Sequence, residues 1–341
     1  MQTNVTVEQI QEALATQPRV SIANLPTPLE ECPQLSRKLS GEEKGPRIFI
    51  KRDDLTGQAL GGNKVRHMEF RMAAALALGC DTFIYADANN AARATAAACA
   101  KVGLKCVLLV RGERPSQLQG NLLLASVLGA ELEFLNTEDR DEAAVRVAEV
   151  RERLEREGRK PYALQEYPMY HLSAILGYMN AAVEMRGQLE AMGIEKAHIY
   201  MVNGHSQVGL QLGAKLMGLD WSLTGVAVGQ HFETDRPLAT WSRMCSDQLG
   251  FSDSLDEGEI ETTFDYVGPH HGSVTPEGVE AIKLTASTES VILDPAYTGK
   301  GMAALIADVR RGRFSAEDNV VFVHTGGIPI LFESAEEISR Y

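Results

Sequence analysis

The segment GQALGGNKVR (57–66) places a lysine directly after two glycines and an asparagine. The glycines carry no Cβ atom, so a ligand can approach the backbone closely at this point. A helical pattern begins here, and the dipole at a helix N-terminus disfavours the ammonium form of Lys64. A neutral amine is the form in which lysine acts as a base or nucleophile. The alternative is an ordinary turn followed by a solvated lysine, and this segment alone fits both interpretations.

Two further segments lie where ligands commonly bind in α/β proteins. VNGHSQVG (202–209) joins an expected strand to an expected helix, where backbone N–H groups and the helix dipole favour a phosphate. HTGG (324–327) forms the carboxyl end of an expected strand, and ligands of open α/β sheets bind at the carboxyl ends of strands. The second of these segments also fits a plain turn between a strand and a loop. The candidates in the first are Asn203, Gly204, His205 and Ser206.

The elements that must position these residues alternate along the chain, as is typical of parallel sheets flanked by helices. The expected strands are 47–53, 81–87, 105–112, 130–136, 198–204, 223–229 and 319–327. The expected helices are 62–79, 92–103, 116–129, 206–218 and a charged one within 138–160. This order predicts an α/β fold with two doubly wound parallel-sheet domains and the site in the cleft between them. The small domain is expected over 55–165, inserted into a large one made of 1–54 and 166–341.

Composition and net charge argue against several classes of function. The chain has 341 residues and a formal net charge of −13, which argues against non-specific binding to nucleic acid or anionic membranes. Its five cysteines are an odd number without a C-x-x-C pair, which favours reduced thiols in a cytoplasm. No apolar run approaches ~20 residues, so no membrane span is expected. The polar N-terminal segment does not resemble a signal peptide.

Five segments, in order along the chain, carry a resemblance to a known family. They are LPTPLEECPQLS (25–36), IFIKRDDLTGQALGGNKVRHMEF (48–70), GNLLLASVLGAELEFL (120–135), DPAYTGKGMAALI (294–306) and HTGGIPILF (324–332). Together they resemble the D-cysteine desulfhydrases and 1-aminocyclopropane-1-carboxylate (ACC) deaminases, over nearly the whole chain. That family belongs to the fold type II enzymes, which use pyridoxal 5′-phosphate (PLP). The resemblance therefore implies PLP in the cleft between two domains, and a homodimer.

By this resemblance, Lys64 forms the Schiff base with PLP and removes the Cα proton of the substrate. Tyr297 matches an active-site tyrosine near the substrate, and Thr298 matches the partner of the pyridine nitrogen. Thr325 is implied to lie close to the cofactor ring, and Asn90 on the cofactor side. A hydroxyl at position 298 fits the desulfhydrase branch, since the deaminase branch typically has glutamate there. Such a partner leaves the ring less electron-withdrawing, which suits a β substituent that departs readily.

The sequence departs from the family pattern at two loops. The family's Gln-Ser-Asn-x-x-Arg reads Ala-Asn-Asn-Ala-Ala-Arg at 88–93, so Asn90 is kept and Asn89 replaces a serine. An amide can bind a substrate carboxylate, but it cannot relay a proton as a hydroxyl does. The phosphate loop of the family is glycine-rich and ends in threonine. Here His205 adds a side chain to that loop, and Ser206 replaces the threonine hydroxyl.

Two more departures indicate an altered substrate pocket. In YVGPHHG (266–272), His271 stands where the family usually has tyrosine. An imidazole titrates near neutral pH, so His271 is a candidate acid/base group or anion ligand, although two surface histidines fit equally well. His270 adjoins it, and since neighbouring residues rarely bind one ion, no metal site is predicted. The last departure replaces a usual Gly-Gly-Ser-Asn stretch with the bulkier Glu166, Tyr167, Pro168 and Tyr170.

The predicted function is PLP-dependent β-elimination from a small amino acid, D-cysteine or a close analogue, giving pyruvate, ammonia and the leaving group. Tyr297 or His271 would protonate the leaving group or orient the substrate, with Asn89 and Asn90 beside it. One alternative is the same cofactor acting on ACC, L-cysteate or another modified amino acid. Another is a PLP-binding protein without turnover, which the retention of Lys64 and Tyr297 disfavours. A nicotinamide dehydrogenase is set aside because G-x-G-x-x-G is absent.

Overall fold

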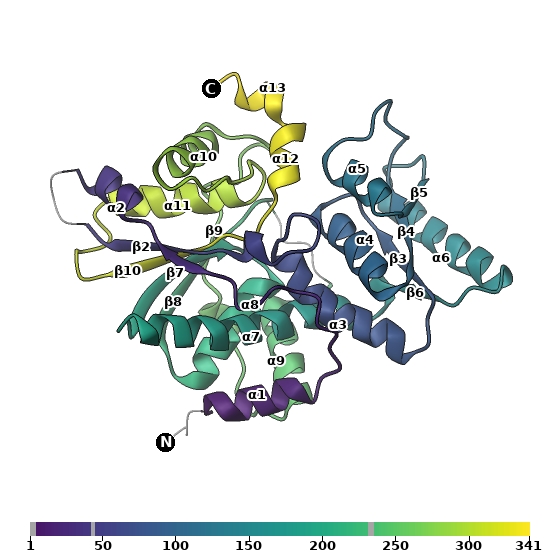
Figure 1. Cartoon of the computed structure of the whole chain (residues 1–341), viewed down its shortest axis with the longest axis horizontal. Helices are drawn as coiled ribbons and strands as arrows, with labels where there is room; N and C mark the ends of the chain where they lie inside the picture. The colour runs from purple at the N-terminus through teal and green to yellow at the C-terminus, as the bar shows by residue number, and fades with distance from the viewer. Residues whose placement is uncertain (1–4, 42–44, 231–234) are drawn as a thin grey trace.

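The computed structural model describes residues 5–41, 45–230 and 235–341, and contains two separate sheets (Figure 1). The larger sheet has six strands in the order β1-β2-β10-β7-β8-β9, and the smaller has four in the order β5-β4-β3-β6. Only β1 and β2 pair antiparallel among the described strands; every other pair is parallel. The chain therefore has the predicted α/β fold.

The larger sheet joins both ends of the chain. Its strands are β1 (Leu29–Glu31), β2 (Arg47–Lys51), β7 (Lys196–Val202), β8 (Asp220–Val226), β9 (Thr262–Thr263) and β10 (Asn319–Val323). Strand β10 lies between β2 and β7, with Val321 opposite both Phe49 and Ile199. These central strands consist mainly of buried apolar residues because both faces of the sheet are covered.

Helices cover the two faces of the larger sheet (Figure 1). One face carries α1 (Val7–Ala15), α7 (Met169–Ala191), α8 (His205–Met217) and α9 (Leu238–Leu249), and the other carries α2 (Pro33–Ser40), α10 (Pro276–Glu289) and α11 (Thr298–Arg310). Helices α7 and α8 approach each other closely at Gly209. A Cβ atom at Gly209 would lie 2.3 Å from the carbonyl oxygen of Ile175, so a larger residue would push the helices apart.

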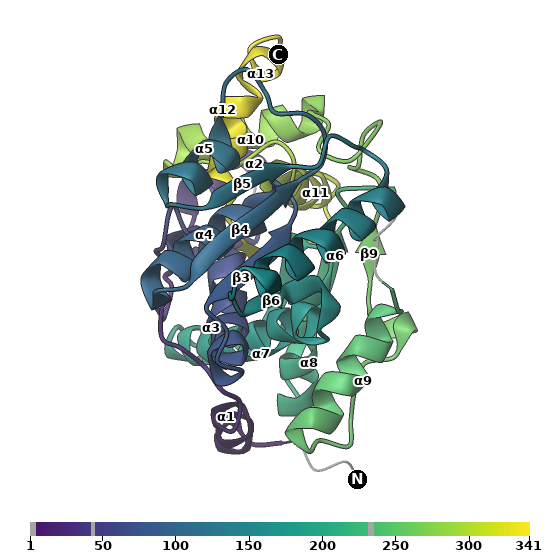
Figure 2. The same ribbon diagram turned by 90° about the vertical axis from the view of Figure 1, so that its right-hand side faces the viewer.

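The smaller sheet is built from β3 (Thr82–Ala86), β4 (Lys105–Val110), β5 (Glu131–Phe134) and β6 (Pro161–Ala163). One face packs against α3 (Asn63–Ala77), α4 (Asn90–Val102) and α5 (Gly120–Val127), and the other against α6 (Arg140–Arg156) (Figure 2). Along β3, Phe83 and Tyr85 face α3 and α4 whereas Ile84 faces α6, as the alternation of a strand requires. All four strands fall within the range expected for the small domain, whose boundaries stay a prediction.

The remaining elements are short. They are α12 (Ile328–Glu333), α13 (Ala335–Ile338) and three 3₁₀ turns, η1 (Asp53–Leu55), η2 (Leu164–Glu166) and η3 (Glu257–Glu259). The described part of the chain has no helix that is both long and apolar enough to cross a membrane. All five cysteines are free thiols, and four of them are buried.

The sequence-based elements match the structure in type, with strands that end earlier than expected. Strand β10 ends at Val323, and strand β3 ends at Ala86, so the polar residues that follow are loops. Helix α7 is the largest element that sequence patterning missed. Most of its first two-thirds is buried on all sides, so it lacks the polar face that would have revealed helical periodicity.

Candidate active site

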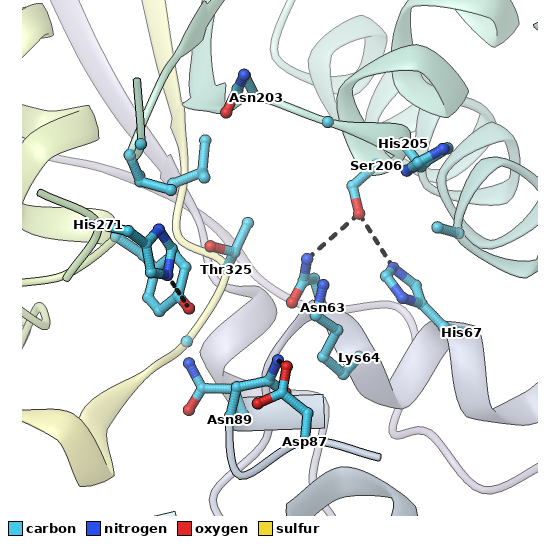
Figure 3. Close-up of a pocket in the computed structure, with 18 of the residues that line it drawn as sticks. Asn63, Lys64, His67, Asp87, Asn89, Asn203, His205, Ser206, His271 and Thr325 are labelled. Carbon is cyan, nitrogen blue, oxygen red and sulfur yellow. Dashed lines mark hydrogen bonds between the residues drawn. The ribbon is translucent and has the colours of Figure 1, made fainter. Parts of the chain in front are cut away.

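A cavity of about 940 Å³ lies at the carboxyl ends of parallel strands from both sheets (Figure 3). Its wall includes residues that directly follow β3, β8 and β10, together with the first turns of α3, α7 and α8. This is where open α/β sheets bind ligands. Ten of the eleven candidate residues line it: Lys64, Asn89, Asn90, Asn203, Gly204, His205, Ser206, His271, Tyr297 and Thr325. Thr298 does not.

The lysine is held by an unusual turn. Six consecutive residues, 57–62, have positive φ angles, and three of them are not glycine: Gln58 (39°), Ala59 (47°) and Leu60 (70°). Each non-glycine residue in this conformation costs roughly 1–2 kcal/mol, so surrounding contacts must hold the turn in place. The side chain of Gln58 donates to the carbonyl of Ile22 at 2.9 Å. Helix α3 then begins at Asn63, which places Lys64 in its first turn.

The turn packs directly against the end of β10. The backbone N–H of Asn63 donates to the carbonyl of Thr325 at 3.0 Å. A Cβ atom at Gly326 would lie 2.7 Å from the Cα of Gly62, so the two backbones touch where a side chain has no room. This close contact between the two backbones explains why both segments have glycine here. The contact also brings Lys64 next to the loop that contains Thr325.

Buried ion pairs form a network next to the turn that carries Lys64. Arg66, two residues after Lys64, donates from Nη2 to Asp53 at 2.8 Å and from Nη1 to Glu184 at 3.0 Å. Lys51 also pairs with Glu184, and all these side chains are buried or nearly so. Burial alone would raise the pKa of Asp53, but the neighbouring Arg66 and Lys51 outweigh it and lower that pKa. The network ties α3 to α7 and β2, which fixes the direction of the lysine-bearing turn.

The environment of Lys64 favours the neutral amine. Burial, and secondly the positive charge of Arg71, lower the pKa of Lys64 to about 8, while Asp87 opposes the shift. A lysine near this value is partly unprotonated at physiological pH and can act as nucleophile or base. The structure thus supports the neutral form that the helix N-terminus suggested.

The start of α8 forms a polar cradle beside the lysine (Figure 3). The Oγ of Ser206 accepts a hydrogen bond from Nδ2 of Asn63 at 3.2 Å and lies 3.0 Å from Nε2 of His67. Among the described residues, the backbone N–H groups of Ser206 and Gln207 have no acceptor. Burial, and then the nearby charge of Lys64, hold the pKa of His67 well below its usual value, so its ring is neutral. Free N–H groups at a helix N-terminus are suited to a phosphate.

Two substrate-side candidates meet on the opposite wall. The Oη of Tyr297 lies 3.3 Å from Nε2 of His271, and their rings contact edge to face with centroids 5.7 Å apart. Burial, and secondly the charge of Asp294, raise the pKa of Tyr297, so its hydroxyl keeps its proton. Sequence reasoning proposed these two residues separately, and the structure places them in contact.

The two asparagines at the start of α4 have different partners. Asn89 caps the helix: its Oδ1 accepts from the N–H of Ala91 at 2.8 Å, and its Nδ2 donates to Asp87 at 2.7 Å. The Oδ1 of Asn90 accepts from Arg93 at 3.1 Å. Both ends of the Asn89 amide are therefore engaged in local structure.

Thr298 does not line the cavity. Its Oγ1 donates to Oδ2 of Asp294 at 2.6 Å, and its side chain is fully buried. Asp294 also accepts from the N–H of Tyr297 at 2.8 Å, so the carboxylate orders the start of α11. Contact between Thr298 and a pyridine nitrogen stays a prediction, whereas Thr325 lies on the cavity wall.

The bulky segment before α7 only partly reaches the cavity. Tyr170 lines it, but Tyr167 stacks on Tyr162 with ring centroids 4.3 Å apart, and Glu166 pairs with Arg151 at 2.6 Å. The expected change in the pocket therefore comes from Tyr170 and its neighbour His171, whose ring packs on His205 at 4.3 Å.

Several cavity residues escaped sequence reasoning. His67 and Arg71 follow Lys64 by three and seven residues, so all three share one face of α3. That spacing was visible in the sequence and would have identified them once Lys64 was chosen. Asp87 carried no such signal, because its approach to Lys64 depends on how the smaller sheet packs against α3.

These features together define a class of enzyme. A lysine with a lowered pKa shares a cavity with a helix N-terminus whose N–H groups are suited to a phosphate, in a parallel α/β fold. That donor set fits PLP, whose aldehyde needs a neutral lysine amine and whose phosphate needs N–H donors. Residues 20–326 match the family model described as pyridoxal-phosphate dependent enzyme, and the chain belongs to this family. It is an enzyme whose cofactor is PLP.

Individual relatives show which members of this family the chain resembles. The chain is 36% identical over 326 residues to D-cysteine desulfhydrases from Salmonella choleraesuis and Klebsiella pneumoniae, covering 92% of this chain and 95% of each relative. Among solved structures, an ACC deaminase homologue superposes with a TM-score of 0.84 at 32% identity, over 97% of this chain and 98% of that one. A threonine deaminase from Solanum lycopersicum, at 19% identity and a TM-score of 0.66 over 98% and 87% of the two chains, shares the fold.

Proposed function

We propose that this protein is a PLP-dependent lyase that removes the thiol group of D-cysteine, or of a close analogue, by β-elimination. D-cysteine and water would become pyruvate, ammonia and hydrogen sulfide. The observation that carries the proposal is the Tyr297–His271 contact in the cavity that contains Lys64 (Figure 3). This arrangement supplies one base and a separate proton donor, as elimination requires. The similarity to D-cysteine desulfhydrases supports the choice of substrate.

Lys64 acts on the Cα proton in this proposal. Bound at Lys64, PLP supplies an electron sink for the electron pair that the Cα–H bond releases. The free amine of Lys64 would then take the Cα proton of the bound substrate. The lowered pKa of Lys64 favours this step, because a lysine at its ordinary pKa would be protonated and unable to accept a proton.

Tyr297 acts on the departing sulfur. Its raised pKa keeps the phenol protonated, so it can donate a proton as the Cβ–S bond breaks. His271 holds the phenol in position through the 3.3 Å contact and can return the proton afterwards. The start of α4, with Asn89 and Asn90, favours the substrate carboxylate through the positive end of the helix dipole.

The remaining candidates hold the cofactor. Ser206 and the backbone at the start of α8 bind the phosphate, with Asn203, Gly204 and His205 shaping the loop. Thr325 lies at the end of β10, directly beside the lysine-bearing turn, and is suited to contact the ring.

The experiment is an absorbance titration with product analysis. The purified protein should show a band near ~410–420 nm from cofactor bound to a lysine, and D-cysteine should change this band while pyruvate and sulfide accumulate. D-alanine is the matched control, since it has the same configuration and no leaving group: it should change the spectrum without giving pyruvate. L-cysteine, L-cysteate and ACC complete the panel. If ACC alone is turned over, the protein is a deaminase. If no amino acid changes the spectrum, the proposal that the protein is a lyase is contradicted.

We propose in addition a cytoplasmic homodimer. The free thiols support a reducing compartment. Val127 of α5 and Phe332 of α12 are 75% and 70% exposed, and a hydrogen bond from the Asn121 N–H to Glu333 joins these two helices. Exposed apolar side chains on adjoining helices favour association. Light scattering should give twice the mass of the chain, and Phe332→Ser should shift the protein toward monomer; monomeric wild type would contradict the proposal.

A further inference from the structure

Arg71 is a buried positive charge without a carboxylate partner among the described residues. Its side chain is almost fully buried, and its contacts there are neutral. Nε donates to Oγ of Ser173 at 2.8 Å, Nη2 donates to the carbonyl of Tyr170 at 2.6 Å, and the Tyr170 ring lies 5.1 Å away. Nη1 is buried with no hydrogen-bond partner. A buried charge is strongly unfavourable unless an opposite charge balances it, so the structure points to a negatively charged ligand.

The position of Arg71 identifies the part of the cavity involved. Arg71 lines the cavity and lies one helical turn beyond His67 on the same face of α3. Its hydrogen-bond partners, Tyr170 and Ser173, belong to the first turns of α7. His171, in the same turn, packs on His205, the first residue of α8. Arg71 therefore lies at the α8 end of the cavity, where the phosphate cradle is.

That cradle contains no cation of its own. Asn63 and Ser206 are neutral, and burial holds the pKa values of His67 and His205 well below their usual range. Among the described residues of the cavity wall, the other cations are Lys64, whose charge would be lost on binding the cofactor aldehyde, and Arg111, which is exposed after β4. A phosphate dianion would otherwise be bound by dipoles alone, and Arg71 is the buried charge available to balance it.

We propose that Arg71 supplies the positive charge that balances the phosphate group of PLP. Arg71 is then a cofactor-binding determinant outside the phosphate loop, placed by the spacing of one helix face. The inference rests on the proposed placement of the phosphate at the start of α8. It does not depend on which amino acid the enzyme consumes.

The test compares PLP with pyridoxal, the same aldehyde without the phosphate. Apoprotein would be titrated with each by absorbance and fluorescence, for wild type, Arg71→Leu and Arg71→Lys. Arg71→Leu should weaken PLP binding roughly 10- to 100-fold, as expected for loss of one partner from a buried charge pair, and leave pyridoxal binding unchanged. Arg71→Lys keeps the charge and should recover most of the PLP affinity. Arg111→Leu removes an exposed cavity charge and is the matched control, with PLP affinity close to wild type.

The outcomes separate this inference from the proposed function. Equal losses for PLP and pyridoxal, or no loss for either, would overturn the role of Arg71. Unchanged PLP affinity with a raised KM for the amino acid would overturn it too and assign the charge to the substrate carboxylate. A wild-type protein that binds PLP but turns over no amino acid would contradict the lyase and leave the Arg71 comparison valid.

Discussion

The phenol of Tyr297 and the imidazole of His271 lie 3.3 Å apart, although the two residues are 26 positions apart in the sequence. Asp294 fixes one partner by accepting the N–H of Tyr297 at the start of α11. The other partner comes from the loop before α10, where the side chain of Ser273 donates to the carbonyl of His270 at 2.6 Å. Two independently ordered loops thus deliver one tyrosine–histidine pair to the cavity.

This pair should behave as one unit in kinetics. Tyr297→Phe removes the proton donor and should lower kcat about 10²–10⁴-fold, the usual contribution of a general acid. His271→Asn should lower kcat less, because the phenol remains. The double variant should be hardly slower than Tyr297→Phe alone, since His271 acts through the tyrosine. Multiplicative losses across this double-mutant cycle would show that the two residues work independently.

Replacement of the lysine should abolish both cofactor attachment and turnover. Lys64→Ala should lose the absorbance band near ~410–420 nm that marks cofactor bound to a lysine, and also pyruvate production. Lys101→Ala, on the exposed end of α4, is the control and should resemble wild type in both measurements. A Lys64→Ala protein that kept the band and the turnover would require another lysine to carry the cofactor.

The capture of PLP by apoprotein should depend on pH in a defined direction. Only the neutral amine attacks the aldehyde, and the pKa of Lys64 is lowered to about 8, so the capture rate should rise with pH and level off above that value. Asp87 raises the pKa of Lys64 by its negative charge, so Asp87→Asn should move the midpoint to lower pH. Stopped-flow absorbance measures both profiles. A wild-type rate that keeps rising to the ordinary lysine range would show that Lys64 is not perturbed.

Breaking the buried network of ion pairs around Arg66 should lower the free energy of unfolding. Asp53→Asn leaves Arg66 buried with one ionic partner fewer, and such changes typically destabilise by about 3–5 kcal/mol. Thermal unfolding of the apoproteins should show the loss. Glu336→Gln, in an exposed pair with Arg340, is the control, and exposed pairs contribute about 0–1 kcal/mol. Equal melting temperatures for wild type and Asp53→Asn would mean that the network does not support the fold.

The left-handed turn before the lysine predicts a stabilising substitution. Leu60→Gly should relieve about 1–2 kcal/mol of backbone strain, against about 0.5–1 kcal/mol of added chain entropy. Leu60 is 51% exposed, so little burial is lost. Leu78→Gly is the matched control, because Leu78 is 61% exposed but has a φ of −84° and should only be destabilised. Apoprotein melting temperatures should therefore move in opposite directions; a fall for both would mean that the turn is not strained.

Much of the site could be predicted because its signals are local. Lys64 follows glycines, Ser206 lies between a strand and a helix, and Tyr297 belongs to a continuous motif. Each of these positions depends on neighbours within a few residues. His67 and Arg71 were also within reach, since helix periodicity alone places them on the face of Lys64. The direction of the Thr298 hydroxyl could not be predicted, because it depends on whether Asp294 or a ligand is its acceptor.

The sequence by itself determined the α/β class, the type of most strands and helices, and the cofactor, and it predicted Lys64 as the residue that binds the cofactor. These follow from periodicity, from glycine positions and from motifs that are each continuous in the chain. Only the tertiary structure decided that Tyr297 meets His271, that Asp87 approaches Lys64, and that the loop after β10 touches the lysine-bearing turn. The physical reason is that these contacts join segments from different parts of the chain. The distances between these segments depend on how the two sheets and their helices pack, and no local sequence pattern predicts that packing.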